Sequence, residues 1–144
     1  MARRPLEHIL VAYDGSENAL RACEVASVLA SRFGSKVSLL YVIPTLSIYT
    51  APMADQYYAF QRGAAESAVR ECQGVFDRHG VTATVDIVPA RWSIVETILS
   101  YALDRGASLI VVGARGTGGF EKLLVGGVAS GVVAHAHCPV LVVK

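Results

Sequence analysis

The sequence predicts a single α/β domain with a doubly wound, five-stranded parallel sheet and helices on both faces. Strand-like apolar runs and helical patterns alternate along the chain through five strands, which is typical of parallel sheets with helical crossovers. The length of 144 residues suits one domain. Hydrophobic residues make up 53% of the chain and charged residues 17%, so the chain can fill a large core, and we expect either a small exposed area or a surface partly covered by a partner.

The first strand and helix are marked by a sharp change in pattern. Residues 8–13 are apolar and rich in β-branched side chains, and this run stops at the turn signal Asp14-Gly15. Ser16 can cap a helix, and small apolar residues then recur at helical spacing until Gly34 ends the pattern.

The next strand and helix are separated by a longer connection. Residues 36–43 form a second apolar run, and residues 44–55 contain two prolines and no clear period, so we expect a loop there. In or near this loop are Tyr41, Tyr49, Tyr57 and Tyr58, which either cover a pocket, form a partner surface or pack on the following helix. Helical spacing then covers residues 65–76, and His79-Gly80 ends it.

A third strand is expected at residues 82–88, where mixed polarity indicates the edge of a sheet. Ser93 and Glu96 have the spacing of a capping box, which begins a helix that continues to Gly106. We expect Trp92, the only tryptophan, to pack near the third strand.

The last strands differ in their expected position. Residues 108–112 are apolar on both faces, as a central parallel strand requires. A helical pattern follows over residues 127–137, Pro139 breaks it, and residues 140–143 form a last apolar strand. At the edge of a sheet this strand would expose unpaired backbone groups, so we expect a homodimer paired through Val140–Val143.

The connection after the fourth strand is rich in glycine and leads to a helix start. Free N–H groups at a helix start attract anions, and glycines let an anion approach the backbone. The Walker loop and the dinucleotide fingerprint both fail here, because Glu121 stands where each motif needs a glycine. A tight connection that requires glycines with positive φ is the structural alternative. For Asp14 the structural alternative is a role in the turn and the helix cap alone, without ligand binding.

Taken together, three segments resemble the universal stress protein family across essentially the whole chain. Gly113, Gly116 and Gly126 fit the G-x-x-G, nine residues, G pattern of its ATP-binding members, and the segments 11–16 and 135–143 also look like family signatures. The resemblance implies a sheet in the order 3-2-1-4-5 and a nucleotide-binding domain spanning residues 1–144. Ligands in such sheets bind where neighbouring strands send their connections to opposite sides.

The resemblance also implies which residues surround the nucleotide. Ala12, Asp14 and Val42 would line the adenine and its sugar, where an ionised Asp accepts hydrogen bonds from an amine or a hydroxyl. Phosphates would lie on the glycine loop and the following helix start. The candidate nucleotide-binding residues are Ala12, Asp14, Val42, Gly113, Arg115, Gly116, Gly126, Gly127, Ala129 and Ser130.

The chain departs from the family pattern at two positions of the phosphate site. Gly127 and Ala129 stand where the family has, or often has, a hydroxyl side chain. A lost hydrogen bond to a charged group costs about 1.5–3 kcal/mol, or roughly one to two powers of ten in affinity. We therefore expect weaker contacts to a triphosphate, with ATP, ADP or AMP as the ligand, with or without Mg²⁺.

Three functions stay open on these residues. The first is an adenine-nucleotide-binding stress-response or regulatory protein with little or no catalysis, because no residues are predicted to form a catalytic acid-base pair or an activated nucleophile. The second is a nucleotide-independent dimeric interaction module with a vestigial pocket. The third is a slow ATP hydrolase, for which no catalytic residues are proposed.

Charge and cysteine usage exclude other classes of partner. The net charge is +1 and no basic patch is present, so neither nucleic acid nor an anionic membrane is an expected partner. No apolar run reaches the ~18 residues of a membrane span, and no leader peptide is evident, so we expect a cytoplasmic protein.

The cysteines and histidines are expected to have structural roles. We expect Cys23, Cys72 and Cys138 to be buried apolar residues in a reducing compartment. The spacing of His135, His137 and Cys138 is poor for zinc, and a nucleophilic Cys138 would need a positioned base, so no metal and no catalytic thiol are expected.

Overall fold

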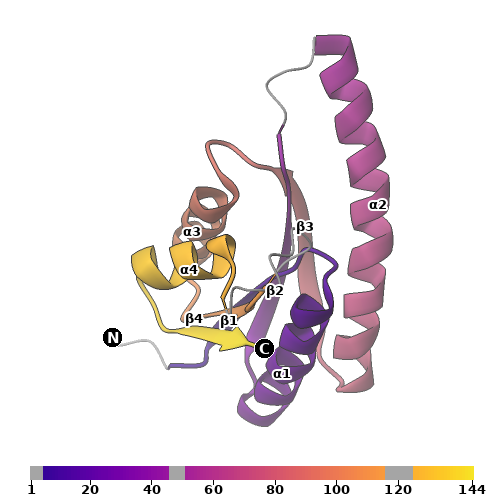
Figure 1. The fold of residues 1–144 in the computed structure, drawn as a ribbon. Helices are drawn as coiled ribbons and strands as arrows, with labels where there is room; N and C mark the ends of the chain where they lie inside the picture. Colours follow the sequence, from indigo (N-terminus) through magenta and orange to yellow (C-terminus); the bar gives the residue numbers. More distant parts are fainter. Residues whose placement is uncertain (1–4, 46–50, 116–124) are drawn as a thin grey trace.

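The computed structural model describes residues 5–45, 51–115 and 125–144, which form one parallel sheet between two layers of helices (Figure 1). The strands are β1 (His8–Ala12), β2 (Lys36–Ile43), β3 (Ala83–Pro89), β4 (Leu109–Gly113) and β5 (Val140–Val143). The helices are α1 (Glu17–Phe33), α2 (Ala51–Arg78), α3 (Ile94–Arg105) and α4 (Gly127–His135). The strand order is β3-β2-β1-β4-β5, which confirms the fold class and the order implied by the family resemblance.

The register of the strands places alternate side chains in two separate cores. Ile9 is paired with Val37 on one side and Leu109 on the other, and these side chains lie in the core beneath α1 and α2. Leu10 and Ile110 are paired in the next row and lie in the core beneath α3 and α4. Because both faces are covered, the central strands β1 and β4 are apolar on both sides.

Helix ends follow the signals in the sequence. The Ser16 hydroxyl caps α1 and the Ser93 hydroxyl caps α3. Gly34 and Gly106 end these helices with φ of 66° and 67°, in the left-handed conformation that glycine tolerates best. The caps fix where each helix begins relative to the sheet.

Helix α2 begins earlier than expected. The predicted loop over residues 44–55 is wrong in its second part, because α2 starts at Ala51 and Pro52 occupies its first turn, where proline is tolerated. None of residues 52–64 is buried, and the large apolar side chains of Met53 and Phe60 in this half of the helix are exposed. Figure 1 shows this part of α2 extending past the sheet.

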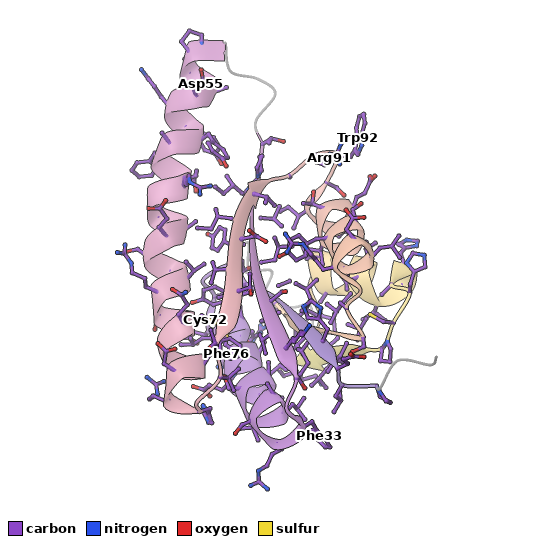
Figure 2. All side chains as sticks on the ribbon, turned by 180° about the vertical axis from the view of Figure 1, so that it is seen from behind. Phe33, Asp55, Cys72, Phe76, Arg91 and Trp92 are labelled. Atoms are coloured by element: carbon purple, nitrogen blue, oxygen red, sulfur yellow. A yellow bond between two sulfur atoms is a disulfide. The ribbon has the colours of Figure 1, made fainter. Side chains whose placement is uncertain are left out.

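Two expectations about single side chains are also wrong. Cys23 and Cys72 are not independent thiols, because a disulfide joins them between α1 and α2. Cys138 is the free cysteine and is partly exposed. Trp92 is 83% exposed and does not pack on β3; Figure 2 shows it on the connection between β3 and α3.

Within the described ranges, no helix is long and apolar enough to cross a membrane.

Candidate functional site

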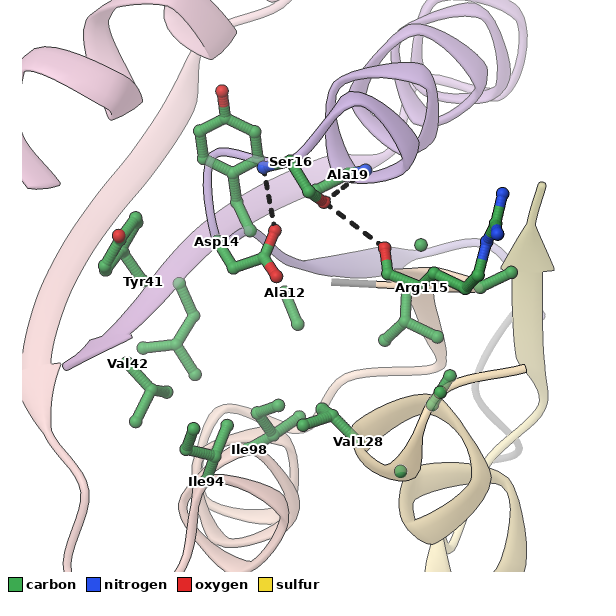
Figure 3. A pocket seen from close by; sticks show the side chains of 18 of the residues that line it. Ala12, Asp14, Ser16, Ala19, Tyr41, Val42, Ile94, Ile98, Arg115 and Val128 are labelled. Atoms are coloured by element: carbon green, nitrogen blue, oxygen red, sulfur yellow. Dashed lines mark hydrogen bonds between the residues drawn. The ribbon is translucent and has the colours of Figure 1, made fainter. Parts of the chain in front are cut away.

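A cavity of about 460 Å³ opens at the carboxyl ends of β1 and β4 (Figure 3). These two strands are neighbours, and the helices that follow them, α1 and α4, cover opposite faces of the sheet. Such a point in a parallel sheet leaves a crevice, and the volume falls within the range of small-molecule sites. The cavity therefore occupies the position that the strand order favours for a ligand.

The rim of the cavity at β1 is held by a network around Ser16. The Ser16 hydroxyl accepts from the N–H of Ala19 (3.2 Å) and donates to the carbonyl oxygen of Arg115 (3.4 Å). The Ser16 N–H in turn donates to Oδ1 of Asp14 (2.9 Å). These bonds join the turn after β1 to the first turn of α1 and to the end of β4, and Figure 3 shows them along one side of the cavity.

Gly113 lies where β4 meets the first turn of α1. A Cβ atom at this position would come within 2.8 Å of both the Ala19 nitrogen and the Asn18 carbonyl carbon. Both contacts are with backbone, which cannot swing aside as a flexible side chain can. Glycine is thus required here for helix-to-strand packing, which sets the width of the cavity between β4 and α1.

The start of α4 supplies the polar end of the cavity. Gly126 is the N-cap with an extended backbone, and its N–H donates to the carbonyl oxygen of Ala114 (2.5 Å). The first ladder bond of the helix is from the Ser130 N–H to the Gly126 carbonyl oxygen. Helix geometry leaves the N–H groups of residues 127–129 outside this ladder, and they carry the positive end of the helix dipole. An anion in the cavity would meet these groups.

The opposite part of the cavity is apolar. Val42 closes one end from β2, and Ile94 and Ile98 line the side formed by α3. Figure 3 shows these three side chains across the cavity from Asp14, with Val128 of α4 beside Ile98. The cavity consequently has an apolar slot at one end and backbone donors with the Ser16 hydroxyl at the other, an arrangement that suits a flat ring carrying an anionic group.

Two tyrosines, Tyr13 and Tyr41, line the cavity together with Asp14. Burial, together with the negative charges of Glu71 and Asp14, raises the pKa of Tyr13 to about 12. Burial and the Asp14 charge also raise the pKa of Tyr41, whose ring meets that of Tyr13 edge-on at a centroid distance of 6.4 Å. Both phenols are therefore neutral at physiological pH and add no charge next to the carboxylate.

Most of the residues predicted for the site lie around this one cavity. Those that line it are Ala12, Asp14, Val42, Gly113, Arg115, Gly126, Gly127 and Ala129. Ser130 is one residue beyond the lining, and Gly116 lies outside the described residues.

The structural alternative of glycines with positive φ is wrong for the described part of the loop. Gly113, Gly126 and Gly127 are not among the glycines with positive φ, and the packing of Gly113 against α1 gives a different reason for its identity. Figure 3 shows the Arg115 guanidinium pointing away from Ile94 and Ile98, and the Arg115 carbonyl oxygen accepts from the Ser16 hydroxyl.

Sequence reasoning missed the apolar wall from α3. Ile94 and Ile98 follow the capping residue Ser93 at helical spacing and are absent from the residues predicted for the site. The cap places the first turn of α3 at the carboxyl edge of the sheet, so these side chains border both the core and the cavity. Ser16 was expected as a helix cap and also lines the cavity.

In the part of the chain that the structure describes, no group of three or more His, Cys, Asp or Glu side chains is placed to hold a metal ion. His135 ends α4, and Cys138 lies before β5 in a separate small hollow that also touches His137. Burial raises the pKa of the Cys138 thiol, which keeps it protonated and less nucleophilic.

Comparisons with known proteins agree with this geometry. Residues 5–144 match the model of the universal stress protein family. A universal stress protein of Thermus aquaticus is 33% identical, with 94% of this chain and 97% of that protein covered. One from Methanocaldococcus jannaschii is 31% identical, with 94% and 81% covered. The solved structure of a universal stress protein from Lactobacillus plantarum has a TM-score of 0.89 and 28% identity, and the match covers 99% of this chain and 100% of that one.

Two further solved structures share the fold and hold nucleotides. A universal stress protein of Archaeoglobus fulgidus in complex with dAMP has a TM-score of 0.75 at 20% identity, and the match covers 98% of this chain and 100% of that one. A universal stress protein in complex with cAMP has a TM-score of 0.67 at 23% identity, with 96% of each chain covered.

Proposed function

This chain belongs to the universal stress protein family, and from that premise we propose that its cavity binds an adenine nucleotide as part of a regulatory stress response. One observation carries the proposal: a single cavity joins an apolar slot to the N-terminus of α4, and the Asp14 carboxylate lies on the facing side of the same cavity. Relatives with this fold that hold dAMP and cAMP are consistent with the ligand class.

The charges in the cavity fix the direction in which a nucleotide would lie. Phosphates would lie on the N–H groups of residues 127–129, because these groups carry partial positive charge. Asp14 repels phosphate and accepts hydrogen bonds, so it suits the ribose hydroxyls. The base would then occupy the slot between Val42, Ile94 and Ile98.

The residues at the start of α4 favour binding of a nucleotide with few phosphates and little catalysis of its hydrolysis. Gly127 and Ala129 line the cavity and offer no hydroxyl to a γ-phosphate or to a metal ion bound to it. ATP, ADP and AMP are all candidate ligands in this proposal, and Mg²⁺ would bind together with the nucleotide, on its phosphates. A slow ATP hydrolase is the second candidate, and turnover that falls in an Asp14 variant would favour it.

The test is a calorimetric titration with ADP at up to millimolar concentration. We expect saturable binding, and about tenfold or greater weakening in Asp14→Asn, because a charged acceptor is lost while the amide oxygen still serves the Ser16 N–H. Asp77→Asn is the matched control, since Asp77 is an exposed carboxylate on α2 outside the cavity. Absence of saturable binding by the unmodified chain would favour the nucleotide-independent interaction module.

Dimerisation through β5 is part of the proposal. Strand β5 pairs only with β4 among the described strands and has four partly exposed side chains, so its outer edge can pair with a second copy. Deleting residues 140–144 is expected to give monomeric or insoluble protein in sedimentation experiments. A soluble dimer unchanged by the deletion would contradict this part. We also propose a cytoplasmic location, which fractionation would test.

A further inference from the structure

We propose that Cys23 and Cys72 form a reversible redox latch that sets how tightly the cavity holds its nucleotide. The inference rests on the proposed function, because it concerns regulation of the same site. Both cysteines are fully buried, and their disulfide joins α1 to α2 across 49 residues of sequence. Figure 2 shows Cys72 one helical turn before Phe76, on the half of α2 that is anchored in the core.

Each end of the latch lies one helical turn from the rim of the cavity. On α1, Cys23 follows Ala19 by four residues, and Ala19 lines the cavity and donates to Ser16. On α2, Cys72 follows Ala68 by four residues, and the Cβ of Ala68 is 3.7 Å from the position of a Cβ on Gly15. The turn Asp14-Gly15-Ser16 therefore lies close to both of the helices that the disulfide joins.

The disulfide fixes against α1 a helix, α2, that is unevenly buried. None of residues 52–64 is buried, and the residues of α2 that lie in the core, such as Ala65, Val69 and Phe76, belong to its second half. Cys72 lies in this second half, so a transient opening of that part of α2, which costs less than global unfolding, would bring reagents to the buried sulfurs. In the disulfide form α2 and α1 hold the rim in place, whereas in the dithiol form the rim can relax.

The oxidation is a balanced two-electron step. With a hydroperoxide as oxidant, one thiolate attacks a peroxide oxygen, the O–O bond breaks, and an alcohol leaves after protonation. The second thiol then displaces water from the sulfenic acid and forms the S–S bond. A dithiol reverses the step by thiol–disulfide exchange and becomes a disulfide itself. In a reducing compartment the pair would rest as thiols and close under oxidant.

Oxidation is expected to strengthen nucleotide binding. Ordering the rim before the ligand arrives lowers the conformational cost of binding. We expect the dissociation constant for ADP to be about fivefold or more larger in the dithiol form, at the low end of typical coupling between sites.

The experiment uses the full chain with Cys138→Ser, which removes the remaining thiol in a hollow separate from the nucleotide cavity. One sample is treated with tert-butyl hydroperoxide and one with dithiothreitol. Peptide mass mapping confirms the Cys23–Cys72 cross-link or its absence, and each sample is titrated calorimetrically with ADP. A Cys23→Ala/Cys72→Ala variant is the control, and it should bind like the dithiol form with or without hydroperoxide. If that variant does not fold, the comparison between the disulfide and dithiol forms of the Cys138→Ser chain still shows whether oxidation changes the affinity for ADP.

Equal dissociation constants in the two verified states would overturn the latch and leave nucleotide binding intact. Failure of the hydroperoxide to form the cross-link would also overturn it. Absence of ADP binding in both states would overturn the latch and the proposed function together, so the two failures are distinguishable.

Discussion

Restoring a hydroxyl at the start of α4 is expected to strengthen triphosphate binding. Among the described residues, and leaving aside its neighbours in α4, a Cβ at position 127 would meet no atom within 4 Å, so Gly127→Ser adds its side chain to the cavity lining without a clash there. A hydroxyl hydrogen bond to a charged phosphate contributes about 1.5–3 kcal/mol, which corresponds to a roughly 10- to 100-fold tighter dissociation constant for ATP.

The control for this change is Gly127→Ala. It adds the same Cβ and improves helix propensity by ~1 kcal/mol or less, but it offers no hydrogen bond. Calorimetric titration with ATP compares the three chains, and adenosine serves as the ligand without phosphate. If Ser and Ala at position 127 bind ATP equally, or if the gain appears also for adenosine, the assignment of phosphates to α4 is refuted.

Three further predictions concern the scaffold around the cavity. Gly113→Ala should lower the free energy of unfolding by about 1–3 kcal/mol in urea denaturation, because its Cβ would meet the backbone of α1. Gly74→Ala is the control, because a Cβ at this position on α2 has no described neighbour within 4 Å, and it should not destabilise the protein. Equal effects of the two substitutions would contradict the packing argument. Reducing the Cys23–Cys72 disulfide should lower the free energy of unfolding by up to about 4 kcal/mol for a loop of this length, and an unchanged midpoint would argue against the cross-link. The folded state raises the pKa of Tyr13 from 10.0 to about 12, so folding favours the neutral phenol. The contribution of Tyr13 to the free energy of unfolding is therefore fully present below pH 10 and should be lost as the pH rises from 10 to 12. Tyr13→Phe should reduce this loss of stability between pH 10 and 12. If the free energy of unfolding depends on pH identically in the two chains, the argument is contradicted.

The strands could be predicted well from sequence. Strands β2 and β5 match their expected ranges, because short apolar runs ended by turn residues are a local signal. The edge position of β3 followed from its mixed polarity, and the central position of β4 from its apolar run. The full strand order required the family resemblance, since periodicity alone does not say which strands are neighbours.

The features that could not be predicted depend on tertiary context. Cys23 and Cys72 pair only because α1 and α2 lie side by side on the same face of the sheet, and spacing in the sequence gives no such information. The start of α2 was missed because the period expected for a core-facing helix begins only at Ala65, the first buried residue of α2 among the described side chains.

The candidate site was predicted unevenly for the same reason. Asp14 and Gly113 were expected to face one pocket because of topology, and both line the cavity. The reason for a glycine at 113 was not predicted, because its close approach to Asn18 and Ala19 exists only once α1 has folded against β4. Ile94 and Ile98 were recognised as apolar but not as a binding wall, since core and cavity residues carry the same pattern.

The most direct test of the account is a map of backbone amide shifts by nuclear magnetic resonance during titration with ADP and with adenosine. The account predicts that ADP shifts the amides of residues 127–129 together with those around Asp14, whereas adenosine shifts the Asp14 side and the apolar slot and leaves 127–129 nearly unchanged. Saturable shifts confined to another part of the molecule, or equal shifts at 127–129 with both ligands, would contradict it.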